Sequence, residues 1–420
     1  MEKNIIRAIK GTKDILPDQS KKWQDLESSF RKFIQTYGYR EIRTPAFEKT
    51  KLFARGVGEN TDIVTKEMYT WEDHNGKSLT LKPELTAPVV RAYIQHNLAG
   101  ESPFTKLYYF DALFRRERPQ KGRQRQFHQF GVEAFGSENP EQDAEIIAIA
   151  WHMLSDCGLN QTVSLRLNSI GSSKCRSDYR NVLKDFIRPN RDQFSETSQK
   201  RFDTNPLRIL DTKLDHEQTL LEGAPIVSEC YTSEDKVHLE SLQNFLTAME
   251  IPFTIDPRLV RGLDYYSRTV FEFTSPVLGA QDALLGGGRY DGLVETLGGK
   301  PTPGIGFAAG MERFLIAMDN QSNVSKTDVY FICLGEEGLS TALSLTNELR
   351  QSRLNVMFDP MRRSLKAQLR EANKLGARFA LILGDTEMKK GTVVFKDLEK
   401  GEQKNILQKK IKNLFDNLTN

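Results

Sequence analysis

The chain is poor in the residues that build metal centres and disulfide frameworks. Its 420 residues include four cysteines, and none of them forms a CxxC pair. This spacing argues against a structural zinc site, a redox dithiol or a disulfide framework, so we expect reduced thiols and no metal held by the protein itself. The six histidines have no triad-like or metal-ligand spacing, and we interpret them as structural or surface residues. The cysteines are Cys157, Cys175, Cys230 and Cys333.

Long apolar runs are also missing. No stretch approaches the roughly 18 consecutive apolar residues that a membrane helix needs, and the first segment, MEKNIIRAIKG, lacks the apolar centre of a secretory signal. The composition, with 38% hydrophobic and 27% charged residues, is typical of a folded soluble protein. We therefore expect a cytoplasmic protein of two or three domains that makes no membrane contact.

Two familiar nucleotide-binding motifs are absent. Gly76-Lys77-Ser78 looks like the end of a P-loop, but the position that requires the first glycine is Trp71. The segment GIGFAAG has the wrong glycine spacing for a dinucleotide fingerprint. If the protein binds a nucleotide, it does so with other elements.

The net charge of +3 is unevenly distributed. The segment from Lys326 to the end contains 17 Lys and Arg residues and 12 Asp and Glu residues, an excess of five positive charges. Two clusters, 115–125 and 361–378, each hold six basic residues and one acid. Either cluster can bind phosphates, although these runs taken alone favour a solvated surface.

The N-terminal part alternates helical and strand-like segments. Apolar residues at helical spacing predict a helix over 18–37, and EIRTPAFE predicts a short strand that Pro45 confines to a sheet edge. A strand at 78–82 and a helix at 83–98 follow. TKLYYFDALFR and QFHQFGVEAFG then predict an antiparallel hairpin around the basic loop, and Asn139-Pro140 predicts the start of a helix that ends near Gly158.

The pattern changes twice further along the chain. Residues 172–248 are polar and helical with no clear strand, which predicts an inserted helical module. Glycine-rich strands return in RGLDYYSRTVFEF, LLGGGRYDGL and PGIGFAAGMERF, and after the polar linker DNQSNVSKTD a β-α-β-α-β alternation predicts a separate α/β unit. The predicted domains are a core in two parts, 1–171 and 249–323, the insertion 172–248, and a C-terminal domain 326–420.

The hairpin and the glycine-rich strands carry candidate binding residues. On the second hairpin strand Gln129 and Glu133 share a face across Gly131, an arrangement that suits a small ligand with a cation or N–H donors, or else a solvent-facing strand. The glycines of GIGFAAG let a flat ring approach the backbone, and Arg313 in the first turn of the next helix indicates that an external anion is expected there.

Together these segments resemble a known family. LKPELTAPVVRA, FRRERPQKGRQRQFHQFGVE, RGLDYYSRTVFEF, GGGRYDGL and GIGFAAGMERF are similar to segments of class II aminoacyl-tRNA synthetases, and specifically of the histidyl-tRNA synthetase family. The resemblance implies an α+β catalytic domain with an antiparallel sheet of the class II type, a helical insertion and a C-terminal α/β anticodon-binding domain. RTPAFE resembles the motif through which class II enzymes form homodimers. Lys82 and Leu85 depart from the usual bacterial LRPEGT.

The resemblance also implies roles for individual residues. It places the catalytic charges on Arg115, Arg261 and Arg313. ATP would be bound by Arg115, Glu117, Arg123 and Arg313. The histidine-binding residues would be Glu84, Leu85, Thr86, Arg115, Gln129, Glu133, Arg261, Tyr265, Tyr266 and Tyr290.

The implied partners are ATP with Mg²⁺, L-histidine and tRNA. The implied reaction forms histidyl-adenylate and then transfers histidine to tRNA, mainly by positioning and charge neutralisation. One rival is the synthetase-like regulatory subunit of ATP phosphoribosyltransferase, which lacks the C-terminal domain and has eroded ATP motifs. The others are a synthetase for another amino acid, which RGLDYY with Gln129 and Glu133 disfavours, and a pure RNA-binding module, which would not need the ATP arginines.

Overall fold

The computed structural model describes residues 5–59, 61–120, 122–279, 282–318 and 327–419. Most of the predicted linker DNQSNVSKTD lies outside these residues. The chain divides into two compact units, Met1–Asn320 and Gln321–Asn420. Among the described residues no helix is both long and apolar enough to cross a membrane.

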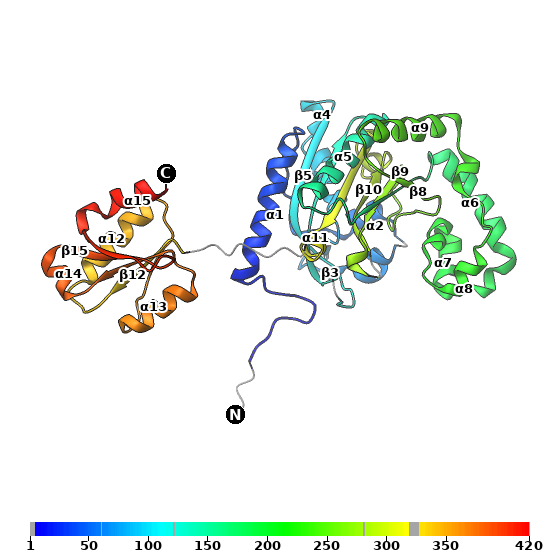
Figure 1. The fold of residues 1–420 in the computed structure, drawn as a ribbon. Helices are drawn as coiled ribbons and strands as arrows, with labels where there is room; N and C mark the ends of the chain where they lie inside the picture. The colour runs from blue at the N-terminus through cyan, green and yellow to red at the C-terminus, as the bar shows by residue number, and fades with distance from the viewer. Residues whose placement is uncertain (1–4, 60, 121, 280–281, 319–326, 420) are drawn as a thin grey trace. The chain divides into compact units, whose positions relative to one another are not determined.

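An eight-stranded sheet forms the centre of the first unit (Figure 1). Its central strands pair antiparallel, as predicted, and only the short edge strands pair parallel to their neighbours. In spatial order the strands are β1 (Arg40–Glu41), β5 (Thr105–Phe114), β6 (Gln126–Phe135), β11 (Gly304–Gly310), β10 (Ala283–Arg289), β9 (Ser267–Thr274), β7 (Ser164–Ser169) and β8 (Thr254–Ile255). The sequence patterns did not identify β7.

Side-chain alternation on β6 separates the core from the site. Phe130, Val132 and Ala134 point to one face, where they join the main hydrophobic core. Phe127 and Phe135 belong to a second apolar cluster on the opposite face. Because a strand has a two-residue period, Gln129 and Glu133 share this second face, as predicted.

Helices cover both faces of the sheet. In α1 (Pro17–Gln35), for example, the apolar residues Leu26, Phe30 and Ile34 recur at helical spacing and pack into the main core. The core face of the sheet is covered by α1, α5 (Pro140–Asp156), α9 (Ser233–Ala248) and α11 (Met311–Met318). The other face carries α2 (Thr50–Val57), α3 (Thr86–Gln95), α4 (Leu98–Glu101) and α10 (Leu293–Thr296).

The segment EIRTPAFE does not form the single strand that we expected. Only its first residue, Glu41, belongs to β1 at the edge of the large sheet, and its last two residues begin β2 (Phe47–Lys49) in a different sheet. Pro45 lies between the two strands, and proline cannot donate a ladder hydrogen bond. The second sheet has the order β2, β4 (Ser78–Leu81) and β3 (Tyr69–Glu72). A π-helical turn, Ile63–Glu67, lies in the chain between β2 and β3.

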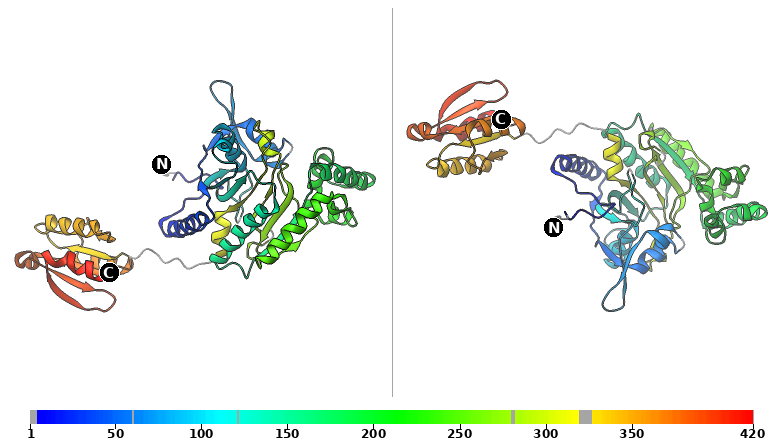
Figure 2. Two further views of the ribbon diagram at one scale, coloured as in Figure 1. Left: turned by 90° about the horizontal axis from the view of Figure 1, so that it is seen from above. Right: turned by 90° about the horizontal axis from the view of Figure 1, so that it is seen from below.

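The predicted insertion is helical, and its described residues contain no strand. Figure 2 shows this green module at the end of the unit away from α1. Its elements are α6 (Ser173–Ile187), α7 (Glu196–Thr204), α8 (Asp215–Leu220) and three 3₁₀ turns, Arg188–Gln193, Pro206–Asp211 and Val227–Cys230. Helix α9 falls within the predicted range 172–248, but its Leu242 and Leu246 pack in the main core.

The second unit is a sheet between helices, as the alternating pattern predicts. Its spatial order is β13 (Val356–Phe358), β12 (Val329–Cys333), β14 (Phe379–Leu383), β15 (Thr392–Asp397) and β16 (Gln403–Leu407). The first three strands are parallel and the last two antiparallel. Helices α12 (Leu339–Gln351) and α15 (Ile411–Thr419) pack on one face and α13 (Leu365–Lys374) on the other, while α14 (Asp385–Lys390) precedes β15.

Removing every residue after Asn320 should leave the first unit folded, because the buried clusters of each unit contain residues of that unit alone. Circular dichroism should show a cooperative thermal transition within a few degrees of the first-unit transition in the full chain. A truncated protein that melts without cooperativity would show that the first unit depends on the second.

Candidate active site

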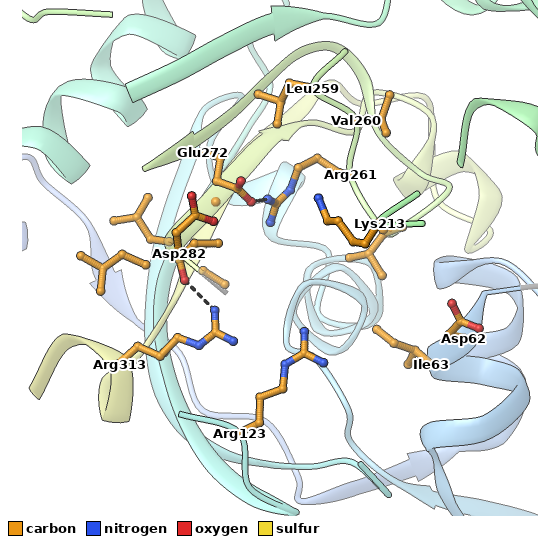
Figure 3. Close-up of a pocket in the computed structure, with 18 of the residues that line it drawn as sticks. Asp62, Ile63, Arg123, Lys213, Leu259, Val260, Arg261, Glu272, Asp282 and Arg313 are labelled. Carbon is orange, nitrogen blue, oxygen red and sulfur yellow. Dashed lines mark hydrogen bonds and ion pairs between the residues drawn. The ribbon is translucent and has the colours of Figure 1, made fainter. Parts of the chain in front are cut away.

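Six of the predicted site residues meet in one cavity of the first unit. The cavity has a volume of about 860 Å³ and lies between the glycine-rich strands, the loop 115–125 and the helical insertion. In Figure 3 the charged ends of Arg123, Arg261 and Arg313 point into the same space. The six residues are Arg115, Glu117, Arg123, Gln129, Arg261 and Arg313.

Two glycines let charged side chains lie flat against the sheet. A Cβ atom at Gly286 would overlap the Arg261 guanidinium, and one at Gly306 would overlap the Glu133 carboxylate. Only glycine leaves this space. The glycines of GIGFAAG were predicted to let a flat ring approach the backbone; at Gly306 the space is taken by the protein's own Glu133 carboxylate.

Arg313 is held at the cavity wall by backbone carbonyls. Its Nη1 donates to Ala283 O at 2.6 Å and its Nε to Gly122 O at 3.3 Å. Burial lowers the pKa of Arg313, and the nearby Arg123 lowers it further. Cations that repel one another around a cavity favour the binding of an anion there.

Arg115 and Arg123 share a carboxylate. Arg123 Nη1 lies 3.2 Å from Glu117 Oε2, and Arg115 Nη1 lies 3.7 Å from Glu117 Oε1. Arg115 Nε also donates to Pro83 O at 2.8 Å, and its guanidinium stacks over the Phe127 ring at 5.2 Å. One carboxylate thus orients two cations without neutralising both.

Arg261 forms an ion pair with Glu272 on β9. The register explains the pairing, because Glu272 lies directly opposite Gly286, the glycine that accommodates the Arg261 guanidinium. The Glu272 carboxylate raises the pKa of Arg261 even though burial opposes the charge. Arg261 is therefore a fixed, fully charged group at the cavity wall.

Glu133 is a buried carboxylate surrounded by hydroxyl groups. Its Oε1 accepts hydrogen bonds from Thr86 Oγ1 at 2.8 Å and from Tyr109 Oη at 3.1 Å, and its Oε2 accepts one from Tyr290 Oη. Burial raises the pKa of Glu133 to about 8 despite these hydrogen bonds. The carboxyl group is thus poised to take or lose a proton near neutral pH.

Glu84 caps the helix that carries Thr86. Its two oxygens accept the backbone N–H groups of Thr86 and Ala87, both at 2.9 Å, at the N-terminus of α3. Burial raises the pKa of Glu84 to about 7. In this structure both Glu84 oxygens are engaged by backbone, so Glu84 orients Thr86 toward Glu133.

The two departures from LRPEGT have separate structural roles. Lys82 is buried, and its ammonium group lies 2.5 Å from Asp111 Oδ2 and 3.1 Å from Thr44 O. Leu85 is buried in the apolar cluster beneath α3. Both side chains support the turn between β4 and α3.

Seven of the predicted histidine-binding residues do not line the large cavity. Tyr266 lines a smaller cavity of about 340 Å³ that also contacts Arg261, and Tyr265 lines another of about 400 Å³. Burial raises the pKa of Tyr266, Arg261 lowers it and Glu133 raises it, so its hydroxyl lies near both groups. Six of the seven are buried, and Tyr265 is half-buried between two apolar clusters. We call this set the Glu133 cluster: Glu84, Leu85, Thr86, Glu133, Tyr265, Tyr266 and Tyr290.

The structure adds residues that the sequence patterns did not identify. Tyr109 lies opposite Gly131 on the paired strand and so reaches Glu133, and Glu272 fixes Arg261. Strand register could have indicated both. The insertion contributes Arg208 and Lys213 to the cavity wall, and Figure 3 shows Lys213 there. No pattern in the sequence of the insertion indicated that these two residues would lie at the cavity.

The carboxylates of the cavity do not form a metal cage. Among the described residues, no group of three or more His, Cys, Asp or Glu side chains has an arrangement that could hold an ion. Glu117 and Glu272 both line the cavity, but each is paired with arginine.

Comparisons with family models match both units. The model described as Histidyl-tRNA synthetase matches residues 11–314, and the model described as Anticodon binding domain matches residues 328–419. Among curated proteins, a histidine–tRNA ligase of Thermoanaerobacter pseudethanolicus is 47% identical over 98% of this chain and all of its own length. A histidine–tRNA ligase of Desulfitobacterium hafniense is 46% identical, with 95% of each chain covered.

The chain also resembles solved structures along most of its length. The apo histidyl-tRNA synthetase of S. aureus has a TM-score of 0.83 and 36% identity, and the match covers 98% of this chain and 100% of that one. A Bacillus halodurans structure titled ATP phosphoribosyltransferase regulatory subunit/histidyl-tRNA synthetase has a TM-score of 0.66 and 20% identity over 89% of this chain and 97% of its own. At that identity the second match concerns the fold alone.

Replacing Glu133 with glutamine should change how stability depends on pH. The folded-state pKa of about 8 lies above the ordinary 4.5, so the folded protein binds the extra proton and loses stability as pH rises from about 4.5 to about 8. Glutamine does not titrate. The melting temperature of Glu133→Gln relative to the parent should therefore be higher at pH 8.5 than at pH 5.5.

The exposed Glu240→Gln substitution on α9 serves as the control and should show no such trend. A Glu133→Gln difference that stays constant or falls between the two pH values would contradict the raised pKa of Glu133.

Proposed function

The chain belongs to the histidyl-tRNA synthetase family, and on that premise we propose that it activates histidine with ATP and attaches it to tRNA. The observation that carries the proposal is the meeting of Arg115, Arg261 and Arg313 in one cavity next to the buried Glu133 cluster. Three fixed cations suit a polyphosphate, and a buried carboxylate suits a small cationic ligand.

Activation joins the two substrates at the Arg261 wall. A carboxylate oxygen of histidine attacks the α-phosphorus of ATP, the bond to the β-phosphate oxygen breaks, and pyrophosphate leaves. Arg261, held by Glu272, faces the charge that develops at the α-phosphate. Arg115 and Arg313 face the leaving pyrophosphate. No side chain has to remove a proton, so catalysis rests on orientation and charge neutralisation.

ATP would enter as its Mg²⁺ complex. Glu117 and Glu272 are each paired with arginine, and the carboxylates that line the cavity form no group of three metal-binding side chains among the described residues. Magnesium also keeps several waters and prefers phosphate oxygens. We infer that the ion is held mainly by the ATP phosphates, where it neutralises their charge.

The histidine pocket would use the Glu133 cluster. In the protein alone, hydroxyls of Thr86, Tyr109 and Tyr290 satisfy the Glu133 carboxylate. The ammonium and imidazole N–H groups of histidine can take their place, and Gln129 on the same strand face offers a further polar partner. A bound cation stabilises the ionised carboxylate, so binding lowers the pKa of Glu133 and releases its proton.

The second step would transfer histidine to the terminal ribose of tRNA. The ribose hydroxyl attacks the carbonyl carbon of histidyl-adenylate and AMP leaves. The C-terminal unit, which matches the anticodon-binding model, carries an excess of five positive charges from Lys326 onward. Phosphate contacts of this kind weaken with salt: the logarithm of the binding constant falls with the logarithm of salt concentration by a slope of about −0.9 per phosphate neutralised on duplex DNA and about −0.7 on single strands.

A regulatory role without catalysis is the weaker alternative. Such a subunit would not need arginines fixed around a nucleotide-sized cavity, or a C-terminal RNA-binding unit. This chain has both. The full-length match to relatives named histidine–tRNA ligase also supports the enzyme.

We further propose a homodimer through the small sheet. Phe47 and Trp71 lie on β2 and β3, are 51% and 40% exposed, and have ring centroids 5.9 Å apart. Both belong to the sheet that begins in the RTPAFE segment. Two exposed aromatic rings on an edge sheet suit an isologous contact with a second copy of this chain.

Arg261→Ala should leave the fold intact and lower histidine-dependent ATP–pyrophosphate exchange by about a hundredfold or more, because it removes a fixed charge at the reacting phosphate. Arg188→Ala, on the exposed surface of the insertion, is the control. If exchange by Arg261→Ala stays within about threefold of the parent while circular dichroism is unchanged, the role given to Arg261 is wrong.

Sedimentation should detect a dimer of the parent chain at micromolar concentration. Phe47→Glu together with Trp71→Glu should convert it to a monomer, because buried charges without partners oppose association. Met249→Glu, at a similarly exposed apolar residue on another surface, should remain dimeric. A monomeric parent would defeat the proposal.

A further inference from the structure

A fully buried arginine, Arg289, is the last residue of the glycine strand β10. Arg289 has no exposed surface, and it immediately precedes Tyr290 of the Glu133 cluster. Its Nη2 lies 2.6 Å from Asp143 Oδ1 and donates to Asn139 O at 2.8 Å. Its Nη1 donates to Ser137 O at 2.9 Å and to Asp291 Oδ1 at 3.1 Å. None of the catalytic steps above uses this side chain.

Asp143 connects Arg289 to two further elements. The second carboxylate oxygen of Asp143 accepts a hydrogen bond from Thr269 Oγ1 on β9 at 2.5 Å and lies 2.8 Å from His238 Nε2 on α9. Asp143 is fully buried and His238 is 7% exposed. A single carboxylate in the first turn of α5 thus joins β9, β10 and α9.

The network holds both segments that carry the pocket tyrosines. Asp291 N donates to Ser267 Oγ, and Ser267 Oγ donates to Asp291 Oδ2, both at 3.2 Å. Ser267 directly follows Tyr265 and Tyr266. Arg289 therefore anchors the backbone beside Tyr290 and, through Asp291, the end of the RGLDYY loop.

The end of β10 transmits this anchoring to the pocket. Arg289 and Tyr290 are adjacent in the chain, but Arg289 pairs with Asp143 of α5 while the Tyr290 hydroxyl donates to Glu133. The backbone between them is fixed from both sides. If Arg289 loses its partner, the Tyr290 hydroxyl is free to move away from the Glu133 carboxylate.

We propose that the buried Asp143–Arg289 pair, together with His238, is a positioning device for the histidine pocket. It fixes the positions of Tyr265, Tyr266 and Tyr290 relative to Glu133. Through His238 it also connects them to α9, the helix by which the insertion returns to the core. This inference rests on the proposed function. A buried ion pair is a weak source of stability, because apolar residues of similar volume often do as well, so its presence beside the site is better explained by the geometry that it fixes.

The test measures substrate constants and stability of the full-length protein together. Asp143→Asn keeps the size of the side chain and removes the charge that faces Arg289. We expect the KM for histidine in pyrophosphate exchange to rise at least about tenfold, since small misplacements at a site have large effects, while the KM for ATP stays within about twofold.

The matched control is Glu145→Gln on the same helix. Glu145 pairs with Lys106 at 2.7 Å and with Tyr39, away from both tyrosine segments. Glu145→Gln should lower the melting temperature without a selective change in the KM for histidine. If Asp143→Asn behaves like Glu145→Gln, the network has a structural role alone and the proposal fails.

A second pair of variants decides the question if Asp143→Asn does not fold. His238→Gln retains an N–H donor toward Asp143 and should keep the parent KM for histidine, whereas His238→Leu should raise it severalfold. Equal constants for these two variants and the parent would overturn the role of His238. A parent without histidine-dependent exchange would instead defeat the proposed function itself.

Discussion

The site depends on the burial of ionisable side chains against glycine backbone. Strands β10 and β11 have glycines where any Cβ atom would collide with Arg261 or Glu133. A polar or charged group removed from water in this way needs partners, and each one has them: Glu272 for Arg261, and three hydroxyls for Glu133. The glycines thus make room for Arg261 and Glu133 against the sheet. The hydroxyls of Tyr109 and Tyr290 then satisfy Glu133, and the capping of α3 by Glu84 places Thr86 beside it.

Charge balance separates the site into two regions. Beside the loop 115–125, Arg115 and Arg123 share the single carboxylate of Glu117, and the nearby Arg123 lowers the pKa of the buried Arg313, so these positive charges lie close together at the cavity wall. The partners of the Glu133 carboxyl group are hydroxyls rather than cations, and burial raises the pKa of Glu133 to about 8. The first region suits phosphates and the second suits an ammonium or imidazole group. Arg261 and Tyr266 connect the two.

Sequence patterns predicted most of the fold, because periodicity and glycine placement are local properties. The resemblance to class II synthetases pointed to four of the arginines that line the cavity, Arg115, Arg123, Arg261 and Arg313. The patterns placed Gln129 and Glu133 on one face of β6, and the register confirms it. They did not predict that EIRTPAFE divides between two sheets, nor that α9 packs in the main core. Tyr109, Asp143 and Arg289 were missed for the same reason: their roles depend on contacts between residues far apart in the chain, which no single segment encodes.

The central claim is that one chain selects histidine and places it on tRNA. The most direct measurement is the charging of bulk tRNA by the purified protein with each of the twenty amino acids in turn, in the presence of ATP and Mg²⁺. The account predicts aminoacylation with histidine and background levels with the other nineteen. Charging with a different amino acid, or with none while control synthetases charge the same tRNA, would contradict it.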